Sequence, residues 1–187
     1  MVRVGAGQFK GTVLATPPGI RATGAKVRLA LFNILGDSIA GARVLDVFAG
    51  SGALGIEALS RGAAFAAFVE ADTQAVLAIR DNLDRLGPDL PRDAWRVVHQ
   101  DAVQGLASLA GREAPFDVAI VDPPYRTDDA INALNALVEY AMLTRLGIAV
   151  VEHDQRTSLP ETVGRLRQGK RHRYGDTVLS LYMGDPS

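Results

Sequence analysis

Cysteine is absent from the 187 residues of this chain, which excludes disulfides, thiolate catalysis and cysteine-based metal sites. No apolar run approaches the length of a membrane span, and residues 1–11 lack the apolar core of a signal peptide. With 48% hydrophobic and 22% charged residues, the chain is long enough for one well-buried domain with a small appendage. We therefore expect a cytoplasmic protein with no membrane association.

Acidic residues are absent before Asp37 and again between Glu161 and Asp176, although the net charge of the whole chain is only −1. Both segments are basic instead. Their basic residues are Arg3, Lys10, Arg21, Lys26 and Arg28 in the first, and Arg165, Arg167, Lys170, Arg171 and Arg173 in the second. This distribution would suit a neutral core with one positive face for phosphates, but short basic stretches are also common on solvated surfaces.

The stretch 44–55, VLDVFAGSGALG, predicts a buried strand, a tight glycine loop and the start of a helix. Gly50 and Gly52 would let the backbone approach a ligand that any side chain would block. Ser51 is placed to cap the helix that follows. The alternative is an ordinary strand-to-helix turn, which glycine also serves.

After Gly41, apolar strands and helical periodicity alternate, which predicts an α/β fold with a doubly wound, mostly parallel, Rossmann-like sheet. The predicted strands are 43–48, 64–70, 95–99, 116–122 and 147–153. The predicted helices are 26–35, 53–61, 73–86, 102–110 and 129–143. Residues 177–182 predict an antiparallel C-terminal strand, which pairs with 163–168 or with 170–174.

The first segment, 1–19, contains short apolar pieces separated by glycines, and residues 16–19, TPPG, end it. This pattern predicts a small N-terminal β-hairpin ahead of the main fold. We expect a basic N-terminal hairpin extension over 1–24 and the main domain over 25–187.

Acidic or polar residues lie near the carboxyl end of every predicted parallel strand, at the edge where open sheets bind ligands. They are Asp46, Glu70, Asp101, Asp122 and the pair Glu152-His153. A glutamate that closes the second strand can accept hydrogen bonds from two ribose hydroxyls, which indicates a nucleoside-bearing cofactor. Asp101 would serve equally well as the cap of the following helix.

The nature of that cofactor stays open on the glycine pattern alone, because Gly50-x-Gly52-x-x-Gly55 also satisfies the dinucleotide fingerprint. The carboxylates of Asp46 and Asp122 would repel a pyrophosphate, and they favour the cationic sulfonium of S-adenosylmethionine. The three histidines show no metal-like spacing, and we expect no metal.

The most specific signal is the sequence Asp122-Pro123-Pro124-Tyr125. Two consecutive prolines fix the backbone and remove two donors, so that carbonyls are left to accept from a ligand. The Asp122 carboxylate and the Pro123 carbonyl could accept both hydrogens of an exocyclic amino group, while Tyr125 stacks on the base. The hypothesis is in-line methyl transfer to that nitrogen; the alternative is a rigid turn after a buried strand.

Residues 46–52 together with 122–125 resemble the class I S-adenosylmethionine-dependent methyltransferases that act on amino nitrogens. More narrowly, the chain resembles the RsmD family, bacterial enzymes that methylate guanine N2 in small-subunit (16S) ribosomal RNA. Further matching segments are 5–11, 21–23, 27–28, 30–35, 54–63 and 174–177.

The resemblance implies a role for each matching position. S-adenosylmethionine would be held by Asp46, Phe48, Ala49, Gly50, Ser51, Gly52, Glu70, Asp101 and Asp122, with Glu70 at the ribose and Asp101 at the adenine amino group. The target base would be held by Asp122, Pro123, Pro124 and Tyr125. RNA phosphates would be contacted by Arg3, Lys10, Arg21, Lys26 and Arg28. The implied partner is ribosomal RNA or an assembling small subunit, and we expect a monomer.

The chain departs from the family pattern at Ala6, Ala22, Gly24 and Leu29, all in the RNA-facing segment. The target nucleotide is therefore open. Alternatives are the same chemistry on DNA adenine, another RNA or a protein glutamine. A nicotinamide-dependent oxidoreductase and a non-catalytic nucleotide-binding module are further alternatives.

Overall fold

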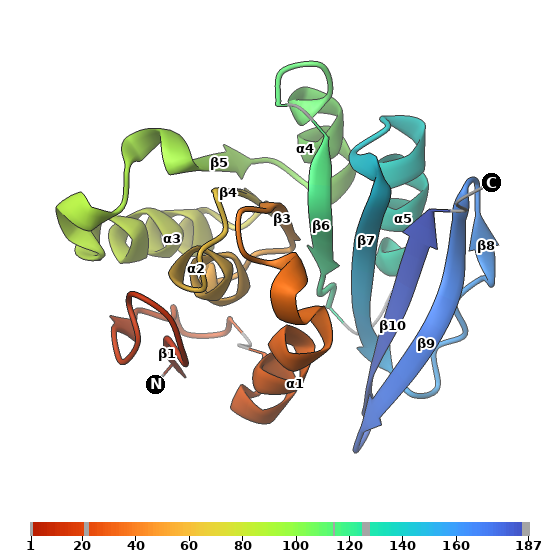
Figure 1. Ribbon diagram of the computed structural model, residues 1–187, viewed down its shortest axis with the longest axis horizontal. Coiled ribbons are helices and arrows are strands. Elements are labelled where there is room, and N and C mark those ends of the chain that lie inside the picture. The colour runs from red at the N-terminus through yellow and green to blue at the C-terminus, as the bar shows by residue number, and fades with distance from the viewer. Residues whose placement is uncertain (1, 21–22, 114, 125–127, 185–187) are drawn as a thin grey trace.

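The structure is a computed structural model that describes residues 2–20, 23–113, 115–124 and 128–184. Its centre is an eight-stranded sheet with the strand order β5-β4-β3-β6-β7-β10-β9-β8 (Figure 1). The strands are β3 (Arg43–Val47), β4 (Phe65–Glu70), β5 (Trp95–His99), β6 (Phe116–Val121), β7 (Leu143–Asp154), β8 (Thr162–Val163), β9 (Leu166–Tyr174) and β10 (Thr177–Gly184). Strands β5, β4, β3, β6 and β7 run parallel, whereas β10 lies antiparallel between β7 and β9.

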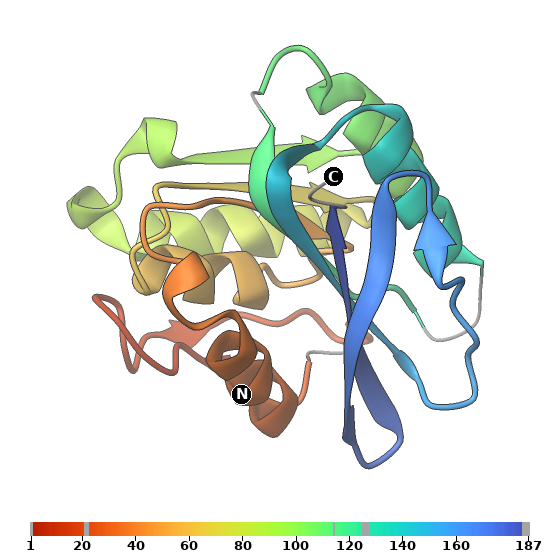
Figure 2. The same ribbon diagram turned by 45° about the vertical axis from the view of Figure 1, so that its right-hand side comes forward.

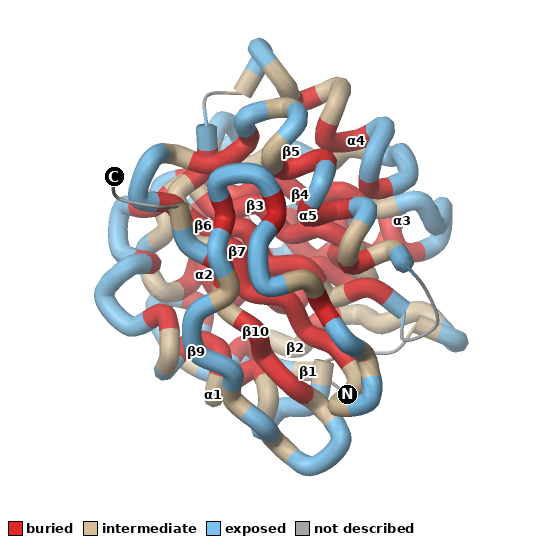
Figure 3. Tube along the Cα trace, turned by 90° about the vertical axis from the view of Figure 1, so that its right-hand side faces the viewer, coloured by how far each residue is buried: buried red, intermediate tan, exposed pale blue. Residues whose placement is uncertain are grey.

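Helices cover both faces of this sheet because successive strand residues point to opposite sides and both sets are apolar. Val44 packs with residues of α1 (Ala25–Leu35), and its neighbour Leu45 packs with residues of α4 (Ala102–Leu109) and α5 (Asp129–Glu139). Helices α2 (Ala53–Ser60) and α3 (Thr73–Arg85) lie on the α1 side. Short 3-10 helices are η1 (Gly36–Ser38), η2 (Gly87–Asp89) and η3 (Arg92–Ala94). Figure 3 shows the central strands as the buried part of the trace and much of β9 as exposed.

The predicted α/β fold with a mostly parallel sheet and antiparallel C-terminal strands is confirmed. Strand β9 pairs with β10 from Leu166 to Tyr174, so both partner segments offered for the last strand belong to one strand.

The predicted helix 129–143 is too long. Helix α5 ends at Glu139, and β7 begins at Leu143 rather than at 147. Ala141 takes a left-handed conformation with φ 49°, and the Met142 amide donates to the Leu137 carbonyl at 2.9 Å. Residues 140–143, YAML, contain no glycine or proline, so no turn-forming residue in the sequence marks this end of the helix.

The N-terminal hairpin consists of β1 (Val2–Arg3) and β2 (Val13–Leu14), and it lies beside α1 and α2 (Figure 2). Helix α2 anchors it: the Glu57 carboxylate accepts from the amides of Gly5 at 2.6 Å and Ala6 at 3.1 Å. The Ser60 hydroxyl donates to the Ala6 carbonyl at 2.6 Å. The predicted hairpin is thus present, whereas the division into 1–24 and 25–187 stays a prediction. None of the helices in the described ranges has the length and apolar character needed to cross a bilayer.

Candidate active site

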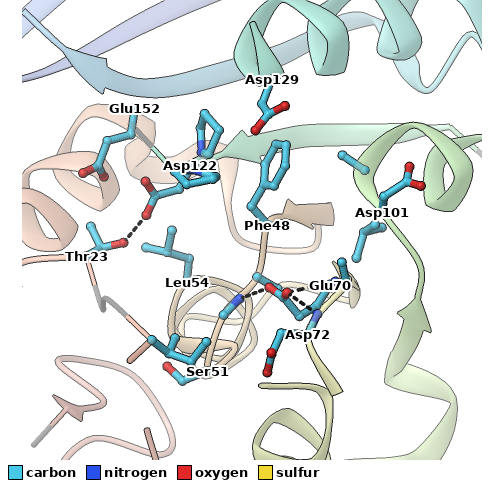
Figure 4. Close-up of a pocket in the computed structure, with 18 of the residues that line it drawn as sticks. Thr23, Phe48, Ser51, Leu54, Glu70, Asp72, Asp101, Asp122, Asp129 and Glu152 are labelled. Carbon is cyan, nitrogen blue, oxygen red and sulfur yellow. Dashed lines mark hydrogen bonds between the residues drawn. The ribbon is translucent and has the colours of Figure 1, made fainter. Parts of the chain in front are cut away.

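A cavity of about 640 Å³ opens at the carboxyl ends of β3, β4, β6 and β7 (Figure 4). Its lining combines the glycine loop after β3, the ends of β4 and β6, and residues that precede α1. It is lined by Gly19, Ile20, Thr23, Phe48, Ala49, Gly50, Ser51, Ala53, Leu54, Val69, Glu70, Ala71, Asp72, Gln100, Asp101, Ala102, Val103, Asp122, Pro123, Pro124, Asp129, Asn132 and Glu152. The structure therefore brings most of the predicted cofactor and base residues around one space.

The loop after β3 turns through three left-handed residues, Phe48, Gly50 and Gly52, with φ of 64°, 56° and 77°. A side chain is strained in this conformation, so the two glycines are explained and Phe48 is an exception that the sequence did not signal. The prediction that Ser51 caps the next helix is wrong. Gly52 is the N-cap of α2, and no side chain caps it. Ser51 is buried, and its carbonyl accepts from Asn82 Nδ2 at 3.0 Å.

Gly55, the third glycine of the fingerprint, serves packing. A Cβ there would lie 2.3 Å from Cε1 of Phe68, so only glycine lets α2 approach β4 this closely. Its amide also donates to Asp46 Oδ2 at 2.8 Å.

Asp46 lies on β3 beneath the glycine loop and is only 1% exposed, and it is not among the residues that line the cavity. Its second oxygen, Oδ1, is buried and has no hydrogen-bond partner among the described residues. The pKa of Asp46 is raised to about 8, chiefly by burial, and the charges of Asp122 and Glu70 act in the same direction; the Gly55 hydrogen bond opposes them. A cation bound at this loop would stabilise the ionised form of Asp46 and so lower its pKa.

Glu70 organises the loops on either side of it. Its Oε2 accepts from the Gly50 amide at 2.7 Å, and its Oε1 accepts from the amides of Ala71 and Asp72, each at 2.8 Å. A carboxylate oxygen can accept two hydrogen bonds, so Oε2 keeps the capacity for one more. In this arrangement Glu70 can accept from one ribose hydroxyl, whereas the prediction had it accept from two.

Asp101 lines the cavity and also caps α4, because its Oδ1 accepts from the Gln104 amide at 2.9 Å. The capping alternative is thus present, and the adenine contact stays a prediction.

Asp122 follows β6 and points into the cavity, where its Oδ2 accepts from the Thr23 hydroxyl at 2.5 Å (Figure 4). Pro123 and Pro124 line the same region. Tyr125 and Arg21, which were predicted to stack on the base and to contact RNA, lie outside the described residues.

Sequence reasoning did not assign a role to Thr23 or Glu152. Glu152 had a signal, since it closes a strand of the parallel sheet as Glu70 does. Thr23 had none, because its contact with Asp122 joins residues 99 positions apart.

The predicted RNA-contacting residues divide into two groups. Arg3, Lys10 and Lys26 are exposed. Arg28 is 7% exposed; its Nη2 donates to the Arg3 carbonyl at 2.6 Å, and its Nε lies 3.9 Å from Glu57 Oε2. We correct the prediction for Arg28: an interior guanidinium that ties α1 to α2 and to the hairpin offers no surface to a phosphate.

A family model described as conserved hypothetical protein 95 matches residues 2–183. The chain belongs to this family, the RsmD family. The resemblance inferred from its motifs is thereby confirmed.

Two curated relatives cover 97% of this RsmD-family chain. It is 40% identical over 183 residues to "Putative rRNA methyltransferase YlbH" of Bacillus subtilis, of which 98% is covered. It is 34% identical over 183 residues to "Ribosomal RNA small subunit methyltransferase D" of Escherichia coli, of which 89% is covered. Among solved structures, "Putative methyltransferase yhhF from Escherichia coli" superposes with a TM-score of 0.84 at 34% identity, covering 100% of this chain and 99% of the other.

Proposed function

We propose that this chain transfers a methyl group from S-adenosylmethionine to the exocyclic N2 amino group of a guanine in small-subunit ribosomal RNA. One observation carries the proposal: a single cavity joins the glycine loop and Glu70 to Asp122, Pro123 and Pro124. Relatives of this RsmD-family chain named as ribosomal RNA methyltransferases support the RNA substrate.

The residues present fit the proposed cofactor. Gly50 lines the cavity in a left-handed conformation with φ 56°, and a Cβ there would be strained and would lie 3.3 Å from Cγ2 of Ile20, so glycine keeps this part of the lining uncrowded. Beneath the loop, Asp46 Oδ1 is a buried acceptor that has no partner among the described residues. The acidic cavity residues Glu70, Asp72, Asp101 and Asp122 suit a cation and would repel a pyrophosphate. This charge pattern favours a sulfonium cofactor over a nicotinamide dinucleotide.

Within this site, Glu70 would hold the ribose, and the loop 48–52 would hold the methionine end. When bound, the cofactor supplies a methyl group on a cationic sulfur, which becomes a neutral thioether on transfer. Glu70 and the loop are held by short backbone hydrogen bonds, so little reorganisation is needed when the ligand enters.

Asp122 and the Pro123 carbonyl orient the amino nitrogen that receives the methyl group. Two acceptors that bind both amino hydrogens turn the nitrogen lone pair out of conjugation with the ring, which makes it nucleophilic. The Thr23 hydroxyl fixes the Asp122 carboxylate for this task. When the nitrogen takes the methyl group and the carbon–sulfur bond of the cofactor breaks, the Asp122 carboxylate would accept the excess proton and pass it to water. Orientation and electrostatics supply most of the acceleration.

RNA binding requires that the target base leave its stack and that the phosphates around it be neutralised. Arg3 and Lys10 are exposed on the hairpin and Lys26 is exposed on α1, the helix that follows the cavity-lining residues Gly19, Ile20 and Thr23. The proposal includes a monomeric cytoplasmic enzyme that acts on ribosomal RNA or on an assembling small subunit.

Calorimetry with S-adenosylmethionine and, in parallel, with NADH tests the cofactor. We expect saturable binding of the methyl donor that weakens in Glu70→Ala. Binding of NADH without binding of the methyl donor would make the glycine loop a dinucleotide site and refute the proposal.

Radiolabelled methyl transfer to unmodified small-subunit RNA and particles, followed by location of the label, tests the reaction. Asp122→Ala should abolish labelling, whereas a non-catalytic binding module would keep its RNA affinity unchanged in this variant. Label on adenine, or on a protein, would assign the chemistry to one of the alternative substrates.

A further inference from the structure

Glu152 is a cavity carboxylate that the reaction described above does not use. It lies on β7 and is 4% exposed. Val121 of β6 is the register partner of Val151 of β7, and the two strands are parallel. Asp122 and Glu152 are therefore the next residues along neighbouring strands, which lie about 4.8 Å apart.

The two carboxylates also point to the same side of the sheet. Val121 and Val151 pack on the α5 side, so the residues that follow them face the α1 side. Figure 4 shows the side chains of Asp122 and Glu152 at one end of the cavity, near Thr23. The residue after Glu152, His153, turns to the other side, where its Nε2 lies 2.8 Å from the Ser180 hydroxyl.

This placement indicates which atom of a bound base the Glu152 carboxylate would contact. If Asp122 and Pro123 hold the exocyclic amino group of a base, the neighbouring strand end faces the ring position next to that amino group. In guanine two ring positions flank the amino group, the donor N1–H and the acceptor N3, and a carboxylate can bind only on the N1–H side. In adenine and cytosine the corresponding ring nitrogen is an acceptor.

We propose that Glu152 selects guanine among the amino-bearing bases by accepting a hydrogen bond from N1–H. An ionised carboxylate only accepts, so adenine or cytosine would place a lone pair against it. Sites that bind a substrate N–H with a buried polar group reject analogues lacking it by large factors, about 10⁴ to 10⁵ in favourable cases. The inference rests on the proposed function and deepens it, because it turns guanine from one of several candidate bases into the base that this cavity accepts.

The test uses 2-aminopurine, which keeps the C2 amino group but has an acceptor at N1. The guanine that the wild-type protein labels is replaced by 2-aminopurine in otherwise identical small-subunit RNA, and kcat/KM is measured on both RNAs. We expect the wild-type protein to prefer guanine by about 100-fold or more. Equal use of the two bases by the wild-type protein would overturn the inference without any variant.

Glu152→Gln is the informative substitution, since its amide can turn either an oxygen or an N–H toward the ring nitrogen. We expect the guanine preference to shrink by about tenfold or more. The intrinsic difference in reactivity between the two bases cancels when the preferences of variant and wild type are compared. An unchanged preference in a folded Glu152→Gln protein would overturn the inference.

Asp154→Asn is the matched control. Asp154 lies on the same strand, its carboxylate is bound to Arg156, and it does not line the cavity. The preference of Asp154→Asn for guanine over 2-aminopurine should therefore equal that of the wild type. Binding of S-adenosylmethionine to Glu152→Gln, measured by calorimetry, should also be unchanged; its loss would assign Glu152 to the cofactor instead. If the wild-type protein labels no RNA at all, the proposed function itself is refuted. That outcome differs from a failure of base selection, in which RNA is labelled without preference for guanine.

Discussion

The buried carboxyl of Asp46 makes the stability of the ligand-free protein depend on pH. Its pKa is about 8 in the folded protein and 3.8 in the reference state. Between these values the folded state binds one proton more than the unfolded state, so the free energy of unfolding falls as the pH rises. The slope is about 1.4 kcal/mol per pH unit, and it flattens near pH 8 as the folded-state carboxyl ionises. From pH 6 to pH 8 the expected loss is about 2 kcal/mol.

The Asp46→Asn variant isolates this contribution. Its amide oxygen can keep the hydrogen bond from the Gly55 amide, while the titration is removed. The free energy of unfolding of both proteins is measured by urea unfolding at pH 6, 7 and 8, followed by circular dichroism. Subtracting the value of the variant from that of the wild type at each pH cancels the contributions of all other titrating groups. We expect the wild-type protein to lose about 2 kcal/mol more than the variant over this range. Parallel pH dependences for the two proteins would refute the raised pKa.

The same carboxyl should couple cofactor binding to proton release. A cation bound at the glycine loop favours the ionised form of Asp46, so binding near pH 7 releases a proton and affinity increases from pH 6 to pH 8. Calorimetry with S-adenosylmethionine in buffers of different ionisation enthalpy measures the number of protons. Net proton uptake in the wild-type protein, or equal release in Asp46→Asn, would contradict this coupling.

Three further substitutions test the fold and the RNA surface. Glu57→Ala should cost about 3 to 5 kcal/mol in chemical unfolding, because it removes a buried acceptor of several contacts, whereas Asp81→Ala, in an exposed i,i+4 ion pair, should cost under about 1 kcal/mol. A mild effect at Glu57 would mean that the hairpin is not held through it. Gly55→Ala should destabilise by about 1 to 3 kcal/mol, since its Cβ would overlap the Phe68 ring; an unchanged thermal midpoint would show that the helix can shift. Lys10→Gln should reduce the slope of log K against log salt for single-stranded RNA by about 0.7, and an unchanged slope would remove Lys10 from the interface.

The fold could be predicted from the sequence to a large extent because its main signals are local. Continuous apolar strands separated by amphipathic segments specify a two-sided parallel sheet, and small residues at Gly50 and Gly52 specify the loop. The edge that binds ligands then follows from strand direction alone, which is why Glu70, Asp101 and Asp122 could be named before the structure.

The remaining features depend on contacts between distant segments. Arg28 has the same local context as an exposed basic residue, and its burial follows from Glu57 on another helix. Ser51 is a good capping residue by type, yet the left-handed turn at Gly52 makes the glycine the cap and directs Ser51 inward. Neither outcome has a periodic signature, because each is decided by tertiary packing.

The contacts of the hairpin and of α1 show what the departures from the family pattern change in the structure. Ala6 is held through its backbone amide and carbonyl, so the change of side chain leaves the anchor on α2 in place. Gly24 is the N-cap of α1 and makes no side-chain capping bond, while Leu29 exposes 55% of an apolar residue on the same helix. The change at Ala6 therefore spares the attachment of the hairpin, and the changes at Gly24 and Leu29 lie on the exposed surface at the start of α1. Ala22 lies outside the described residues. Since Glu57 holds the hairpin from the helix that begins at the glycine loop, RNA contacts on this surface can diverge while the cavity behind them keeps its geometry.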